Sequence, residues 1–230
     1  MKKQSLVVLT GAGMSADSGI TTFRDSGGLW EGHSVMEVAS IEGWQKDPDK
    51  VLNFYNMRRR QLKDVQPNAG HKALANLEVH YDVTIITQNV DDLHERAGSS
   101  HVIHLHGELT KARPDGEEGP VIDIGYSDIL PGDTDDDGRQ LRPDIVWFGE
   151  MVPMMAVASD YVLNCDILWV IGTSLVVYPA AGLVDLLNND QMLVVVDRRK
   201  PDFRFGPKTR FIEKSAAEGV PELVKEYLER

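Results

Sequence analysis

The stretch SLVVLTGAGMS, residues 5–15, decides the fold class of this chain. Its first half, Ser5–Thr10, is largely apolar and has the length of a buried strand. Small residues then follow where a strand would turn into a helix. Such a turn lets backbone N–H groups approach a pyrophosphate, and a helix N-terminus adds partial positive charge. The third glycine of the standard dinucleotide-binding pattern is replaced by Ala16, so a plain tight turn also explains the glycines.

Short apolar runs recur along the chain and alternate with helix-like segments. The other expected strands are Val83–Thr87, Val102–Leu105, Ile145–Phe148, Ile167–Ile171 and Met192–Val196. The expected helices are Asp49–Lys63, Asn68–Val79, Pro153–Leu163, Pro179–Leu187 and Glu218–Leu228. This alternation predicts an α/β fold with a Rossmann-like, doubly wound parallel sheet.

Two regions interrupt the alternation, and we expect one catalytic domain over residues 1–230 with two insertions. Residues 23–64 form a mostly helical insertion. Residues 107–142, rich in Gly, Pro and Asp over much of their length, form a small lobe. The large lobe then comprises residues 1–22, 65–106 and 143–230.

Composition narrows the class of protein. Lys plus Arg is 24 and Asp plus Glu is 36, giving a net charge of −12, which disfavours nucleic-acid or anionic-membrane partners. Cys165 is the only cysteine, so an intramolecular disulfide and a multi-cysteine zinc site are excluded. No apolar run approaches the length of a membrane span. We therefore expect a soluble, cytoplasmic protein, taken as a monomer.

Five segments in order resemble the sirtuin family of NAD-dependent protein deacylases. They are GAGMS at 11–15 with GITTFRD at 19–25, TQNVD at 87–91, HGEL at 106–109, WFGE at 147–150 and GTSL at 172–175. The resemblance implies that NAD is consumed as a co-substrate and that proteins with acylated lysines are the partners. The nicotinamide–ribose bond is cleaved, the acyl oxygen attacks the ribose, and the products are nicotinamide and O-acyl-ADP-ribose.

His106 is the candidate catalytic base. It follows the apolar run Val102–Leu105, and an imidazole pKa of about 6.5 suits proton transfer near neutral pH. From spacing alone, a half-buried loop histidine is the simpler interpretation, and the resemblance reverses this preference. His104 shares the strand face with His106, which leaves a metal site open, but no third ligand is apparent and none is predicted.

Asn89 and Asp91 follow another expected strand. The resemblance implies that they line the nicotinamide pocket and are catalytic residues together with His106. Ordinary turn and N-cap chemistry is the alternative, with Asp92 capping the helix while Asp91 serves the ligand. Asp197 ends a strand where a carboxylate accepts from an adenosine ribose and repels an NADP phosphate, although Arg198 and Arg199 keep NADP open. The remaining expected cofactor-binding residues are Gly11, Ala12, Gly13, Ser15, Phe23, Arg24, Gln88, Gly172, Thr173 and Ser174, with Phe23 and Arg24 on a cofactor-covering loop.

Tyr55 and Arg58 lie three residues apart, hence on one helix face, where a phenol and a guanidinium hold a carboxylate. Sirtuins that prefer succinyl- or malonyl-lysine carry this pair, so the resemblance implies desuccinylase and demalonylase activity, with deacetylase activity retained. Without the resemblance, the run Arg58–Arg60 would be a solvated helix face. The peptide substrate is expected to bind by strand addition in a cleft formed by Val146, Trp147, Phe148, Gly149 and Glu150. A core strand that ends at Gly149 is also compatible with this segment.

The chain departs from the family between residues 107 and 146, where most sirtuins carry four zinc-binding cysteines and this sequence has none. We therefore predict no structural zinc. The acidic stretch DTDDDG, residues 133–138, matches half of a calcium loop, but a solvated loop is favoured. Protein ADP-ribosyl transfer and a non-catalytic NAD- or ADP-ribose-binding module are the alternative functions, and a hydride-transferring dehydrogenase is a weaker one.

Overall fold

The computed structural model describes residues 3–21, 29–30, 32–116, 119–188, 190–203 and 206–229. Its centre is a six-stranded parallel sheet in the order β11-β10-β9-β1-β4-β5. The strands are β1 (Ser5–Thr10), β4 (Asp82–Thr87), β5 (Val102–His104), β9 (Ile167–Ile171), β10 (Met192–Asp197) and β11 (Thr209–Glu213). The strand order reverses between β1 and β9, and ligands bind at such a point in open α/β sheets.

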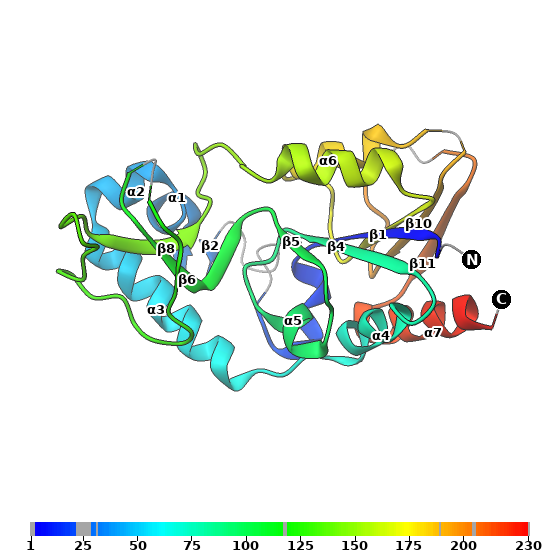
Figure 1. Cartoon of the computed structure of the whole chain (residues 1–230), viewed down its shortest axis with the longest axis horizontal. Helices are drawn as coiled ribbons and strands as arrows, with labels where there is room; N and C mark the ends of the chain where they lie inside the picture. The colour runs from blue at the N-terminus through cyan, green and yellow to red at the C-terminus, as the bar shows by residue number, and fades with distance from the viewer. Residues whose placement is uncertain are drawn as a thin grey trace.

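Helices cover both faces of this sheet, as Figure 1 shows. On one face, α4 (Ala69–Leu77) and α7 (Ala216–Leu228) pack together against the sheet. On the other lie α6 (Met155–Asn164) and the 3-10 helix η3 (Ala180–Leu186). Alternate residues of β1 enter the two hydrophobic layers, because successive side chains of a strand point to opposite faces. The doubly wound fold predicted from the sequence is confirmed.

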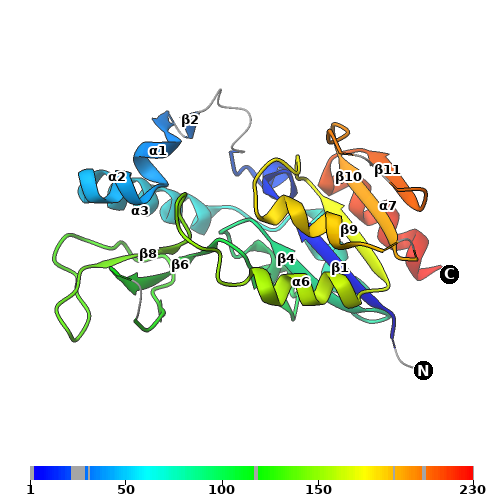
Figure 2. The same cartoon turned by 90° about the horizontal axis from the view of Figure 1, so that it is seen from above.

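A smaller lobe lies at one end of the molecule, on the left of Figure 1. It combines α1 (Val35–Val38), α2 (Ile41–Lys46), α3 (Pro48–Asp64) and an antiparallel sheet in the order β7-β6-β8. The strands of that sheet are β6 (Gly107–Pro114), β7 (Ile122–Asp123) and β8 (Leu141–Ile145), and a hairpin of β2 (Leu29–Trp30) and β3 (His33–Ser34) adjoins the helices. A third hydrophobic cluster fills this lobe, with Trp44, Phe54 and Trp147 among its members. Figure 2 shows the lobe beside the large sheet.

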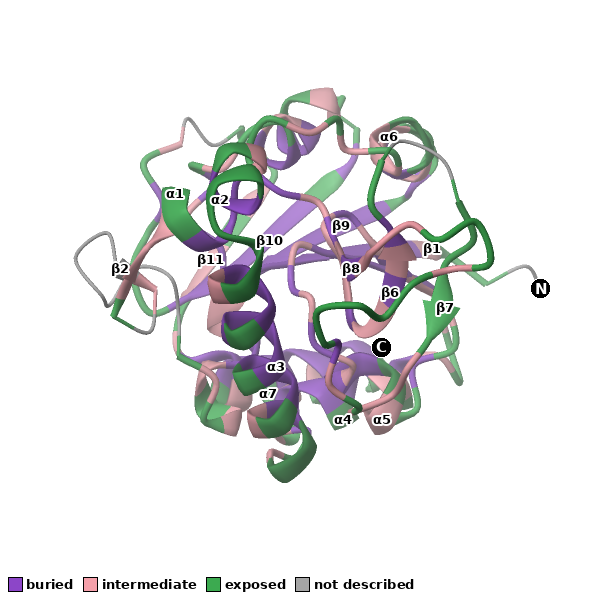
Figure 3. Ribbon diagram, turned by 90° about the vertical axis from the view of Figure 1, so that its left-hand side faces the viewer, coloured by how far each residue is buried: buried purple, intermediate pink, exposed green. Residues whose placement is uncertain are grey.

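Helix α3 has a well-defined start. Asp47 caps it by accepting a hydrogen bond from the Lys50 N–H, and Pro48 occupies the first turn, where no N–H is needed. The helix carries buried side chains along one face and exposed ones along the other (Figure 3). Tyr55 and Arg58 both belong to the buried face of this helix.

Two expectations about secondary structure were wrong. Ile145–Phe148 is no strand of the large sheet: β8 ends at Ile145 and pairs with β6, because Trp147 packs into the cluster of the smaller lobe. No α-helix follows the first glycine loop, which continues as two 3-10 turns, η1 (Ala12–Met14) and η2 (Ala16–Ser18). Within the described ranges, no helix is long and apolar enough to span a membrane.

Candidate active site

A cavity of about 520 Å³ opens where β1, β4, β9 and β10 end, and the smaller lobe closes its far side. Every site residue predicted from the sequence lines it, apart from two that cannot be placed. These two, Phe23 and Arg24, lie outside the described residues. The volume is in the range of roughly 300–1,000 Å³ typical of small-molecule sites. Predicted site residues that are far apart in the sequence, from Gly11 to Asp197, thus line one cavity.

The glycines of the two strand-end loops allow the loops to pack on each other. A Cβ on Gly13 would lie 2.7 Å from the Gly172 Cα, and Gly172 itself has φ +62°. The Gly11 and Gly13 N–H groups donate to the carbonyls of Ile171 (3.0 Å) and Gly172 (2.8 Å). These two groups are therefore engaged within the protein, and a pyrophosphate would bind other donors. With only 3-10 turns following, the expected helix macrodipole is also lacking.

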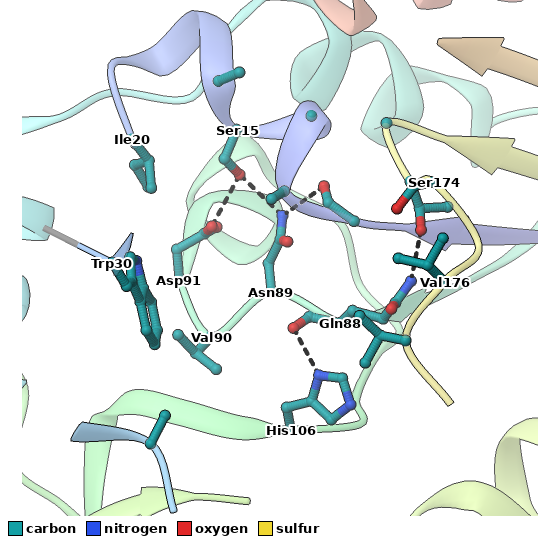
Figure 4. A pocket seen from close by; sticks show the side chains of 18 of the residues that line it. Ser15, Ile20, Trp30, Gln88, Asn89, Val90, Asp91, His106, Ser174 and Val176 are labelled. Atoms are coloured by element: carbon teal, nitrogen blue, oxygen red, sulfur yellow. Dashed lines mark hydrogen bonds between the residues drawn. The ribbon is translucent and has the colours of Figure 1, made fainter. Parts of the chain in front are cut away.

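Asn89, Ser15 and Asp91 form a buried hydrogen-bonded group that lines the cavity (Figure 4). The Asn89 Nδ2 donates to the Gly11 carbonyl and to Ser15 Oγ, each at 3.1 Å. Ser15 Oγ donates in turn to Asp91 Oδ2 at 2.8 Å. Burial raises the pKa of Asp91, and the Ser15 hydrogen bond opposes this. The group presents an amide and a carboxyl in fixed orientations, as recognition of a carboxamide requires.

The helix that follows, α5 (Leu93–Ala97), is capped differently from the sequence expectation. Asp91 Oδ1 accepts the Leu93 N–H at 3.2 Å, whereas the Asp92 side chain makes no capping hydrogen bond. Asp92 instead accepts from Tyr126 Oη and from Arg96. Asp91 therefore combines the capping role with its place in the cavity.

His106 faces the cavity with one tautomer favoured (Figure 4). Its Nδ1 lies 3.0 Å from the Gln88 carbonyl, which only accepts, so Nδ1 carries the proton. In the neutral ring, Nε2 then has a free lone pair. Burial lowers the pKa of His106, while the Gln88 carbonyl opposes this. The Gln88 side chain donates to Thr173 Oγ1, so this residue joins β4 to the loop after β9.

Tyr55 and Arg58 are both buried and both line the cavity from α3. Tyr55 Oη accepts a hydrogen bond from Trp147 Nε1 at 3.0 Å, and its own proton can be donated. Burial raises the pKa of Tyr55 far above its ordinary value, so the phenol keeps that proton. The Arg58 guanidinium lies 5.2 Å from the centre of the Trp30 ring. Phenol and guanidinium thus share one wall, as their spacing predicted.

Residues 146–150 also line the cavity, but the Glu150 side chain is engaged elsewhere. Its carboxylate accepts from Arg113, from Arg142 and from the Trp147 N–H. The Arg142 guanidinium also stacks 3.4 Å above the Trp147 ring centre. Glu150 therefore shapes this segment, whereas Phe148, 44% exposed, offers surface to a ligand.

Another part of the cavity wall is built from the segments that follow β10 and β11. Asp197 is buried and accepts the Arg199 N–H, and Arg198 pairs with Asp17 at 2.5 Å. Residues 214–216, between β11 and α7, also line the cavity. Sequence reasoning missed them because the short strand β11, TRFIE, is neither a continuous apolar run nor a regular alternation. It missed Trp30 because only the folded hairpin brings that ring to Arg58.

The acidic loop is closed on itself. Asp135 accepts from the N–H groups of Asp137 and Arg139 and from the Arg139 side chain. In the part of the chain that the structure describes, no three His, Cys, Asp or Glu side chains form a group that could hold a metal ion.

Comparison with known proteins identifies this arrangement. Residues 11–179 match the profile of a protein family described as the Sir2 family. The chain belongs to the Sir2 family. It is 52% identical to a protein of Helicobacter pylori strain J99, named NAD-dependent protein deacylase, over 98% of this chain and 96% of that one.

Two solved structures of Sir2 proteins have the same fold. One is described as a Sir2 homolog–NAD complex, with 38% identity, a TM-score of 0.86 and coverage of 97% of this chain and 89% of that one. The other, Sir2Tm bound to a propionylated peptide, is 29% identical, with a TM-score of 0.80 and coverage of 99% and 95%. The Sir2 fold of this chain thus agrees with the expectation from its motifs.

Proposed function

We propose that this Sir2 protein is an NAD-dependent protein lysine deacylase that removes succinyl and malonyl groups and, less efficiently, acetyl groups. The observation that supports it best is that Tyr55 and Arg58 line the same cavity as His106. One chamber therefore contains a base for the ribose chemistry and a phenol–guanidinium pair for an acyl carboxylate.

The cavity suits NAD in size and in chemistry. Loops at the switch point of an open α/β sheet commonly bind dinucleotides, and Asp197 and the loop at Gly172 both line this cavity. The Sir2 homolog with NAD shares 38% identity with this chain. When bound, NAD supplies a ribose carbon that becomes electrophilic as nicotinamide leaves.

The residues of this chain have separate roles in the proposal. Asn89 and Asp91 orient the carboxamide of nicotinamide, and Gln88 contacts the ribose. His106 accepts a proton at Nε2 from a ribose hydroxyl, since its Nδ1 is committed to the Gln88 carbonyl. We expect nicotinamide, free lysine and O-acyl-ADP-ribose as products.

The acyl pocket distinguishes charged from neutral substrates. A succinyl carboxylate would accept from Arg58 and from the Tyr55 hydroxyl, replacing water in a buried site where charge-assisted bonds are strong. An acetyl group fits the same space without using the guanidinium, which costs affinity and leaves the chemistry intact. Phe148 and its neighbours provide the edge on which the peptide lies.

The test is a panel of succinyl-, malonyl- and acetyl-lysine peptides incubated with NAD and read by mass spectrometry. Arg58→Met should lower kcat/KM for succinyl-lysine about 10- to 100-fold, through loss of the charge-assisted bonds, with acetyl-lysine changed less than about threefold. Arg60→Met is the matched control, because Arg60 lies on the same helix with its side chain exposed and paired to Asp128. Equal loss with both acyl groups would refute the acyl-pocket assignment.

A further inference from the structure

His104 lies at the end of β5, two residues before His106, and its role is separate from that of the base. Its side chain is only 7% exposed, and it is not one of the side chains that line the cavity. It is therefore a buried titratable group that the proposed chemistry does not use.

Both ring nitrogens of His104 face acceptors. Nδ1 lies 3.2 Å from the Asn89 carbonyl oxygen, and Nε2 lies 2.8 Å from Glu95 Oε1. A carbonyl oxygen and a carboxylate both accept hydrogen bonds, so the ring satisfies both only when each nitrogen carries a proton. Burial opposes it, but the hydrogen bond and charge of His104 lower the pKa of Glu95, so Glu95 is a carboxylate, and the geometry favours an imidazolium paired with it. A neutral ring would lose one of the two hydrogen bonds.

The hydrogen bond from His104 is one of several that hold Asn89 in place. The Asn89 N–H donates to Thr87 Oγ1 at 3.0 Å, and its side chain donates to Gly11 and Ser15. His104 is the partner of the Asn89 backbone carbonyl. This carbonyl belongs to the peptide unit that leads through Val90 to Asp91, so its orientation affects both nicotinamide-pocket residues.

We propose that His104 is a positioning residue: as a cation held by Glu95, it fixes the Asn89–Asp91 segment, and loss of its proton sets the alkaline limit of catalysis. Only the part about the alkaline limit of catalysis rests on the proposed function, because it is tested by measuring activity. The charge of the ring is measurable without turnover.

The surroundings of His104 support this assignment. Burial disfavours the cation, but the hydrogen bond and charge of Glu95 on α5 and the charge of Glu108 on β6 outweigh it, so the pKa of His104 is raised. Asp91 also lies within electrostatic range, and Lys111 is paired with Glu108. His94 on α5 faces the same region, and because burial holds its pKa well below the ordinary value, it adds no positive charge near neutral pH. A raised pKa means that the cation persists at neutral pH and is lost as pH rises through that value.

Glu95→Gln tests the inference, because the amide oxygen still accepts from Nε2 while the charge is removed. Glu95 is 40% exposed, so the variant should fold. For kcat of nicotinamide release measured from about pH 6 to about pH 10, we expect little change at the acid end and an alkaline decline shifted to lower pH. His80→Gln, at an exposed histidine, should leave the profile unchanged. His104→Gln should lower kcat about five- to tenfold, as expected for a lost charge-assisted bond, and abolish the alkaline step.

Nitrogen-15 spectra of the histidine rings supply the measurement that needs no turnover. The signals that are absent from the spectrum of His104→Gln identify the His104 ring. In the wild type at neutral pH, both nitrogens of this ring should be protonated. A neutral ring at that pH, or superimposable pH profiles of wild type and Glu95→Gln, would overturn the inference. A protein that releases no nicotinamide but shows a doubly protonated His104 would contradict the proposed function and leave the assignment of the ring charge standing.

Discussion

At the scale of single residues, the protonation of His106 follows from one backbone contact. The Gln88 carbonyl accepts a hydrogen bond from Nδ1–H, which leaves Nε2 as the basic atom of a ring that lines the cavity. The same principle separates the two histidines of this segment, because His104 meets two acceptors and His106 meets one. Two histidines separated by one residue thus differ in their expected charge, His104 being cationic and His106 neutral, because their hydrogen-bond partners differ.

We predict an acid limb of activity that reflects His106. Burial lowers its pKa, so the neutral base persists below the ordinary value of about 6.5, and activity is lost only as pH falls through the lowered value. The measurement is kcat/KM for NAD against pH at saturating peptide. A midpoint above about 6.5 would mean that another group, or an unburied His106, controls the acid side.

At the scale of elements, α3 ties the acyl pocket to the small antiparallel sheet. Asn56 donates from Nδ2 to the Ile129 carbonyl at 2.8 Å and accepts the Ile129 N–H at Oδ1 at 2.9 Å. Arg59 donates from Nε to the Leu109 carbonyl, and burial lowers its pKa to about 10. The helix that presents Tyr55 and Arg58 therefore also holds the small antiparallel sheet and the loop at Ile129, in a chain without zinc-binding cysteines.

Asn56→Ala should show what this anchor contributes. The substitution leaves the Ile129 N–H and carbonyl buried without partners, which should lower the free energy of unfolding by about 2–4 kcal/mol. Asn53→Ala on the exposed face of the same helix is the control and should change it by less than about 0.5 kcal/mol. Urea denaturation of both variants measures the difference. Equal stability of the two would show that packing alone holds the lobe.

The sequence predicted some elements better than others for identifiable reasons. β1, β9 and β10 are nearly continuous apolar runs between turn residues, and the pattern of a doubly buried parallel strand is unambiguous there. β11 was missed because this edge strand contains only two adjacent apolar residues, Phe211 and Ile212, between the exposed charged residues Arg210 and Glu213. The run at Ile145–Phe148 has the same local pattern as a core strand, and only tertiary packing of Trp147 assigns it to the other lobe.

The site was predictable at the strand ends and less so elsewhere. Polar residues that follow parallel strands meet at one edge of the sheet, so Gln88, Asn89 and Asp197 were expected there, and all three line the cavity. Contacts that depend on a distant hairpin or a lobe, such as Trp30 against Arg58, leave no local pattern. The hydrogen bonds that occupy Gly11 and Gly13 were equally hidden, because they depend on the partner loop.

At the scale of the whole molecule, buried histidines make stability depend on pH. His71 packs edge-on against His94. Burial lowers the pKa of His71 to about 4, and the charge of Glu95 opposes this. The unfolded chain binds this proton at about pH 6.5, so the contribution is full above that pH and is lost as pH falls toward 4. Between about pH 7.5 and pH 5, His71 alone should lower the free energy of unfolding by about 2 kcal/mol.

Urea denaturation at the two pH values, with His71→Gln and His80→Gln compared, measures this contribution. The His71 variant should show the smaller dependence on pH, and the His80 variant should follow the wild type. If the His71 variant lost stability on acidification as steeply as the wild type, the buried neutral ring would be refuted.

The central claim is that one cavity joins a base to a pocket for acylated lysine. The most direct test is nicotinamide release from NAD with a succinylated peptide, in buffer containing EDTA because we predict no zinc requirement. The wild type should release one nicotinamide for each succinyl group removed and none with unmodified peptide, whereas His106→Ala should be slower by about 10²- to 10⁴-fold. Release that does not depend on the acyl group, or equal rates in the two proteins, would contradict the account.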